Sequence, residues 1–147
     1  MPIDKEIPSF LETYAEINLT DLLRNYDIIK KHASKRYQTK SSNNRSQKIN
    51  ICSVVKANAY GHGMLECSEA LTRHGTYCLG TADLNESLQI RYELAKKKLH
   101  PEIFCMGVIP ENKKFLEEVI NSKIEVTLID LKRADILNKI AKKLLIF

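Results

Sequence analysis

Ten residues of the sequence, 54–63 (VVKANAYGHG), hold the side chains best suited to chemistry. Lys56 comes directly after a mostly apolar run that begins at Ile49, so it is expected where a buried strand ends. A lysine in that place must reach water, pair with an acid, or stay neutral as a nucleophile. A neutral amine forms a Schiff base with an aldehyde, whereas a solvated lysine at a strand end is the plainer alternative.

The residues that follow Lys56 favour a tight loop. Gly61 and Gly63 allow the backbone to turn where other residues would be strained. Tyr60 offers a hydroxyl group, although an aromatic residue that packs on a rim is an equally good interpretation. His62 has no charge partner evident in the sequence and is interpreted as a structural loop histidine rather than an acid or base.

The string VVKANAYGHG resembles the cofactor-lysine motif of the alanine racemases. Residues 15–19 (AEINL) with Asn25 resemble the opening segment of that family, and residues 86–91 (ESLQIR) resemble its second barrel helix. The likeness covers most of residues 14–129. The resemblance implies a pyridoxal phosphate enzyme of the TIM-barrel class that interconverts L-alanine and D-alanine to supply D-alanine for peptidoglycan.

The resemblance also implies roles for individual residues. Lys56 would bind pyridoxal phosphate and act as the acid–base group on one face of the substrate, and Tyr60 would bind the cofactor phosphate. A tyrosine from the partner subunit would serve the other face, so a homodimer is expected. The substrate is a small amino acid, with alanine as the default and serine or broad specificity left open. Asn58 and Glu86 match motif positions without an assigned role.

The hydrophobic pattern predicts alternating strands and helices. Strand-like runs begin near Ile49, Thr76, Glu102 and Ile124, and helical patterns follow them over residues 64–74, 84–99, 111–121 and 131–144. Asp83 and Glu86 are spaced as a capping box. This alternation predicts an α/β fold with a parallel sheet, namely a partial (half) TIM-type barrel of about four βα units.

Before this barrel part, the sequence predicts a loose arm, a short strand and a helix. The strand is expected over residues 12–19, and the helix from Thr20, as N-cap, to about Lys35. We therefore divide the chain into an N-terminal arm and strand (1–19) and a partial barrel domain (20–147), in which the polar residues 38–48 form an exposed loop.

The length conflicts with a complete racemase. The chain has 147 residues, whereas a whole barrel needs about 250. The sequence therefore predicts a truncated or fragmentary racemase that is inactive by itself. The alternative is a non-catalytic pyridoxal phosphate-binding barrel protein, but the known proteins of that kind lack the YGHG extension.

Composition argues against several other functions. The net charge is +5, yet the lysines are scattered over the predicted helices without interleaved aromatic residues, so nucleic-acid binding is not expected. No apolar run is long enough to span a membrane, and no signal peptide precedes the arm, which favours the cytoplasm. The four cysteines and four histidines match no metal-ligand spacing, and we expect the cysteines to be reduced core thiols.

Overall fold

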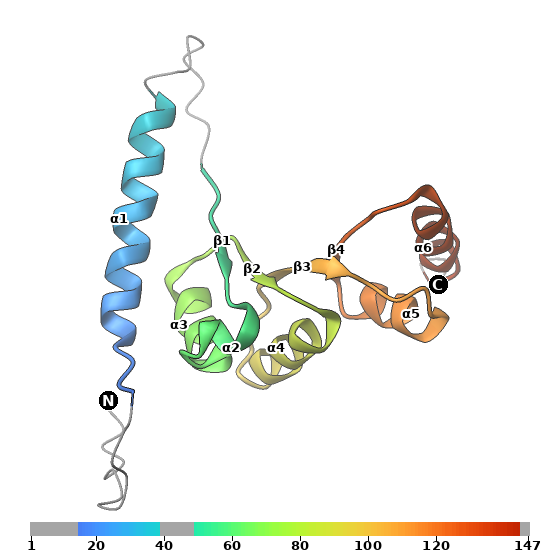
Figure 1. Ribbon diagram of the computed structural model, residues 1–147, viewed down its shortest axis with the longest axis horizontal. Helices are drawn as coiled ribbons and strands as arrows, with labels where there is room; N and C mark the ends of the chain where they lie inside the picture. The colour runs from blue at the N-terminus through green and yellow to red at the C-terminus, as the bar shows by residue number, and fades with distance from the viewer. Residues whose placement is uncertain (1–14, 39–48, 145–147) are drawn as a thin grey trace, which may run out of the picture.

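Strands and helices alternate from residue 52 onward, as the hydrophobic pattern predicts (Figure 1). The computed structural model describes residues 15–38 and 49–144. Its elements are α1 (Leu19–Gln38), β1 (Cys52–Val54), α2 (Lys56–Tyr60), α3 (Met64–His74), β2 (Cys78–Thr81), α4 (Leu84–Lys96), β3 (Glu102–Val108), α5 (Lys113–Asn121), β4 (Ile124–Thr127) and α6 (Leu131–Leu144).

The four strands form one parallel sheet in the order β1-β2-β3-β4. Each strand therefore lies beside the next one in the chain, and α3, α4 and α5 lie on the same side of the sheet (Figure 1). A strand order that follows the chain with all crossovers on one side is the winding of a (β/α) barrel, not of a doubly wound sheet. The predicted α/β class with four parallel strands is confirmed.

The hydrophobic core lies between the sheet and these helices. Leu79 and Ile103 of the sheet are fully buried, as are Ile90 and Leu94 of α4 and Leu116 of α5. A hydroxyl pair also lies in this layer, because Thr81 Oγ1 and Ser87 Oγ are 2.6 Å apart. The helices thus bury one face of the sheet and tie α4 to β2.

The opposite face of the sheet is open among the described residues. A Cβ on Gly80 would lie 3.4 Å from Cys52 Sγ, 3.4 Å from Val54 Cγ2 and 3.5 Å from Met106 Cε, so these side chains share that face. Val54 keeps 39% of its surface exposed and borders the pocket that α1 also lines. This is the face that a closed barrel would turn inward.

Three of the four cysteines are buried free thiols, as expected, but Cys52 is exposed. Cys52 begins β1, the strand at one edge of the sheet, and no described strand lies on its outer side. Cys78 is its neighbour on β2, and burial, followed by the hydrogen bond with Cys52, raises the pKa of Cys78 to about 12.

Helix ends follow the capping residues. α3 ends at Gly75, which adopts the left-handed conformation (φ 89°), and α4 begins at Asp83, whose Oδ1 accepts from Glu86 N at 2.9 Å. α6 occupies the predicted residues 131–144 after Asp130, which accepts from Arg133 N at 2.7 Å. α4 stops at Lys96 rather than at residue 99, because Lys98 is left-handed (φ 58°).

The strand predicted at residues 12–19 is wrong over its described part. Residues 15–18 form no strand, and α1 begins at Leu19. Asn18 rather than Thr20 caps this helix, since Asn18 Oδ1 accepts from Thr20 N (3.0 Å) and Asp21 N (3.2 Å). A strand needs a neighbouring strand for its backbone groups, and β1–β4 pair only with one another. Residues 12–14 and most of the loop predicted at 38–48 lie outside the described residues.

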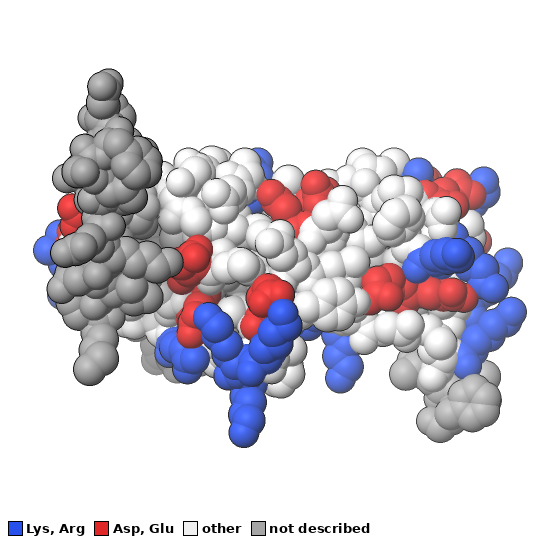
Figure 2. Space-filling view, turned by 90° about the horizontal axis from the view of Figure 1, so that it is seen from below, with Lys and Arg blue, Asp and Glu red and all other residues white. Residues whose placement is uncertain are grey.

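Charged side chains of both signs lie on the helical face of the molecule (Figure 2). Lys97 Nζ pairs with Glu69, and Lys132 Nζ lies 2.6 Å from Glu111. Basic groups on this face are thus accompanied by acids. Within residues 15–38 and 49–144, no helix is both long and apolar enough to cross a bilayer.

Arg91 of α4 joins three segments at the edge where the strands begin. Its guanidinium donates to the carbonyl groups of Pro101 (2.8 Å), Ser122 (2.9 Å) and Lys123 (3.0 Å). Burial lowers the pKa of this guanidinium. The three acceptors precede β3 and β4, so Arg91 fixes both strand starts to α4.

Replacing Arg91 by lysine should therefore destabilise the fold. An ammonium cannot reach three carbonyls in this fork geometry, and hydrogen bonds from a charged donor contribute about 1.5–3 kcal/mol each. We expect Arg91→Lys to lower the free energy of unfolding in urea by about 2 kcal/mol. The matched control is Arg73→Lys on α3, where the exposed pair with Glu69 should lose no more than about 0.5 kcal/mol. Equal urea midpoints for the two variants would show that the three hydrogen bonds of Arg91 do not stabilise the fold.

Candidate functional site

The backbone makes a left-handed turn directly after β1. Ala57, Asn58, Ala59 and Tyr60 have φ angles of 52°, 54°, 52° and 55°. Non-glycine residues adopt this conformation at a cost of about 1–2 kcal/mol each, and asparagine tolerates it best. The sequence predicted a loop at these residues but not its handedness, which the structure shows. Such strain persists only where neighbouring groups fix the backbone.

Backbone hydrogen bonds close the turn. Ala59 N donates to Val55 O at 2.8 Å, Gly61 N to Ala57 O at 3.2 Å, and Gly63 N to Asn58 O at 3.0 Å. Both glycines have positive φ, 90° for Gly61 and 92° for Gly63, as the sequence suggested. The chain then enters α3 at Met64.

Two side chains of the motif support the turn rather than point to chemistry. Asn58 Oδ1 accepts from Met64 N at 2.8 Å and so caps the start of α3. His62 Nδ1 lies 2.8 Å from the carbonyl oxygen of Ala59. Because a carbonyl only accepts, that ring nitrogen carries a proton. This geometry agrees with the structural interpretation of His62.

Glu86 connects this turn to the next strand. Its Oε1 accepts from Ala57 N at 2.7 Å, and its Oε2 accepts from Ala82 N at 2.8 Å. Only half of the predicted capping box forms, because Asp83 caps α4 while the Glu86 carboxylate reaches the turn instead. No local pattern in the sequence indicates this contact, which joins residues 29 positions apart.

Lys56 lies where β1 ends, at the edge of the sheet that the ends of β2, β3 and β4 share. Its side chain is half-buried, and its amine makes no hydrogen bond or ion pair with the part of the chain that the structure describes. In (β/α) barrels the carboxyl ends of the strands carry the active site. The lysine is therefore at the chemically relevant edge, with its amine available.

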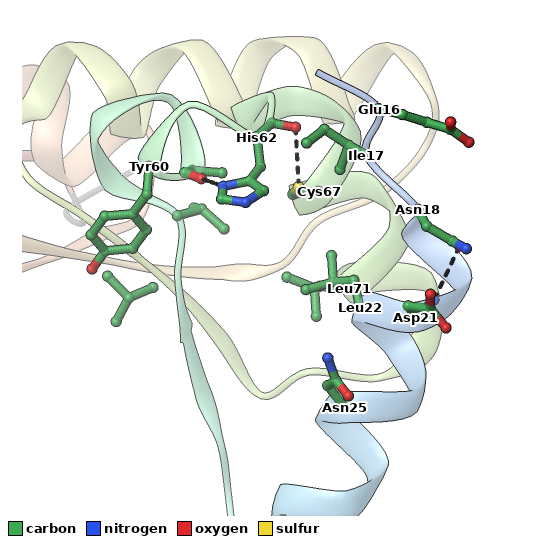
Figure 3. Close-up of a pocket in the computed structure, with 13 residues that line it drawn as sticks. Glu16, Ile17, Asn18, Asp21, Leu22, Asn25, Tyr60, His62, Cys67 and Leu71 are labelled. Atoms are coloured by element: carbon green, nitrogen blue, oxygen red, sulfur yellow. Dashed lines mark hydrogen bonds between the residues drawn. The ribbon is translucent and has the colours of Figure 1, made fainter. Parts of the chain in front are cut away.

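Tyr60 stands at the other end of the same turn, 60% exposed, and its hydroxyl has no partner among the described residues. It lines a pocket of about 440 Å³ between the turn and α1. Figure 3 shows His62 and Tyr60 on the turn side of this pocket and Asp21 and Asn25 on the α1 side. Lys56 does not line it. The structure thus places both predicted site residues on one hydrogen-bonded turn, and Tyr60 but not Lys56 lines the pocket beside α1.

Comparisons with known proteins agree with this geometry. The family model described as "Alanine racemase, N-terminal domain" matches residues 17–145. Alanine racemase 1 of Bacillus subtilis is 34% identical over 103 residues, covering 70% of this chain and 22% of that protein. The alanine racemase of Clostridium kluyveri is 33% identical over 129 residues, covering 88% of this chain and 28% of that protein.

A solved structure extends the likeness to the fold. The alanine racemase of Clostridium difficile 630 superposes with a TM-score of 0.69 at 31% identity, over 91% of this chain and 30% of that one. The chain therefore spans less than a third of the length of these relatives. Because the family match covers nearly all described residues and the strand order is that of a barrel, this chain belongs to the alanine racemase family, in which it corresponds to part of the N-terminal barrel domain.

Proposed function

We propose that this chain provides the cofactor-lysine part of a pyridoxal phosphate-dependent alanine racemase. The observation that carries the proposal is the placement of Lys56. Lys56 lies at the carboxyl edge of a barrel-type sheet, on a turn that hydrogen bonds fix at both ends, and its amine has no partner among the described residues. The whole enzyme's activity on alanine and its assembly as a homodimer are part of the proposal, since the relatives are more than three times as long.

The residues present fit pyridoxal phosphate. An amine without a hydrogen-bonding partner is free to bond covalently to the cofactor aldehyde, and the amine of Lys56 has no such partner in the described part of the chain. The exposed hydroxyl of Tyr60 is free to donate to a phosphate oxygen. When bound, the cofactor withdraws electrons from an attached amino acid and makes its Cα proton acidic.

In this proposal Lys56 has two tasks. Its Nζ would hold the cofactor, and the same amine would accept or return the Cα proton of the substrate on one face. Hydrogen bonds of the turn fix the backbone next to Lys56, which would limit the positions its amine can take. Inversion also needs a group on the opposite face, which we propose a partner subunit supplies.

The chain alone should therefore not racemise alanine at a useful rate. One acid–base group permits a proton to leave and return on the same face, which exchanges the Cα hydrogen without inverting the centre. Exchange of the Cα hydrogen without inversion would distinguish the racemase proposal from a non-catalytic cofactor-binding protein, for which neither exchange nor inversion is expected.

Lys56 should be the lysine that captures the cofactor. We expect borohydride reduction of the chain mixed with pyridoxal phosphate to leave a pyridoxyl group mainly on Lys56, as read by peptide mass spectrometry. Lys97 is a suitable internal comparison, because its amine is paired with Glu69 on the helical face. Labelling spread evenly over the lysines, or unchanged total labelling in Lys56→Arg, would overturn the proposal.

Tyr60→Phe should weaken cofactor binding without unfolding the chain. The hydroxyl is exposed and unpaired among described residues, so its loss costs little stability, whereas a hydrogen bond to a charged phosphate contributes about 1.5–3 kcal/mol. We expect the Kd for pyridoxal phosphate, measured by fluorescence titration, to rise about ten-fold. Tyr77→Phe is the matched control, because Tyr77 is also exposed but precedes β2 at the opposite edge. Equal affinities for both variants would exclude Tyr60 from the phosphate site.

Proton exchange should occur without inversion. We expect the purified chain with pyridoxal phosphate in D₂O to exchange the Cα hydrogen of D-alanine slowly, with retention, and to form no L-alanine above the level of Lys56→Ala. Proton NMR measures the exchange, and a chiral assay measures inversion. Lys56-dependent conversion to L-alanine would show that the chain is active by itself, and absence of exchange would favour the non-catalytic alternative.

A further inference from the structure

We infer that Glu86 is a positioning residue for Lys56: its carboxylate bridges the two backbone segments that carry the ends of β1 and β2 and thereby sets the direction of the lysine. This inference rests on the proposed function of Lys56. It adds a role for a side chain that does not touch the lysine amine and lies on a different helix.

The bridge uses both carboxylate oxygens. Oε1 accepts from Ala57 N at 2.7 Å and Oε2 from Ala82 N at 2.8 Å, which are the lengths of charge-assisted bonds. Ala57 follows Lys56 directly, and Ala82 follows β2 directly. One side chain thus fixes the turn to the neighbouring strand end.

Glu86 itself is firmly held. Its backbone N–H donates to Asp83 Oδ1 at 2.9 Å, and the next residue, Ser87, is fully buried against Thr81. Ile90, one turn further along α4, is also fully buried in the core. The carboxylate therefore reaches the turn from the rigid layer between helix and sheet, and not from a mobile surface.

The turn needs a cap of this kind. The first N–H groups of any helical turn lack a partner within the turn, and Val55, which precedes this one, makes no side-chain cap bond. The carboxylate of Glu86 accepts a hydrogen bond from Ala57 N–H. That N–H belongs to the peptide plane that joins Lys56 to Ala57, so fixing it fixes the backbone torsions on both sides. The direction of the Lys56 side chain follows from this plane.

A carboxylate suits this place better than an amide. Both backbone partners are donors, and a carboxylate presents two acceptors, whereas the amide of glutamine presents one acceptor and one donor. Glu86→Gln therefore satisfies one N–H and turns its NH₂ group toward the other. Glu86→Asp keeps the charge but is one methylene too short to span both partners.

The first test needs no cofactor. Ala57 is exposed, so its amide exchanges quickly with solvent once its acceptor is lost. We expect Glu86→Gln to speed amide hydrogen exchange of Ala57 and Ala82, measured by NMR, by about ten-fold. Glu93→Gln makes the same chemical change at an exposed ion pair on the same helix. This control should not change exchange at Ala57.

The second test measures positioning. Under borohydride trapping with pyridoxal phosphate, we expect the ratio of label on Lys56 to label on other lysines to fall about ten-fold in Glu86→Gln, and also in Glu86→Asp, while Glu93→Gln stays unchanged. The aspartate variant keeps the test valid if the glutamine variant folds poorly.

The outcomes separate this inference from the proposed function. Selective labelling of Lys56 in the unmodified chain and equally in both Glu86 variants would overturn the positioning role alone. Unchanged exchange at Ala57 would overturn the bridge itself. If the unmodified chain shows no selectivity for Lys56, the proposed function fails, and the positioning role fails with it even if exchange at Ala57 responds to Glu86→Gln.

Discussion

The left-handed turn after β1 is the constraint on which the site depends. Four consecutive non-glycine residues in this conformation carry a combined cost of about 4–8 kcal/mol, so the turn exists only because other groups hold it. Backbone bonds close it, Asn58 connects it to α3, and Glu86 connects it to β2. Ala59 is buried beneath it. The benefit is rigidity at the residue that follows β1, because a strained turn held at several points has few other conformations.

The two ends of the strands differ in how their polar side chains are used. At the edge where strands begin, Arg91 uses its donors to join α4 to the segments before β3 and β4. At the edge where strands end, the Lys56 amine and the Tyr60 hydroxyl have no partners among the described residues. This division agrees with the general rule that barrels place stability at one end and chemistry at the other. It also explains why the unpaired groups do not weaken the fold.

The open face of the sheet connects the fold with the family. The helices α3, α4 and α5 bury one face, while Cys52, Val54 and Met106 share the other. In a closed barrel such side chains meet those of further strands. The relatives, of which this chain spans 22–30%, are long enough to contain such strands. The proposed cofactor binding and the proposed inversion of the substrate are thus separable questions, since the first depends on the turn and the second on groups from both faces of the substrate.

The sequence by itself determined the alternation of strands and helices, several helix ends and the position of Lys56. Apolar periodicity and capping residues act locally, so the helices over residues 64–74 and 131–144 and the Asp83 cap were predicted correctly. Tertiary structure decided what depends on partners distant in the chain. No local pattern specifies the hand of the turn or the reach of Glu86 to Ala57 across 29 residues. For the same reason the strand expected up to residue 19 gave way to α1, because a strand exists only where another strand accepts its hydrogen bonds.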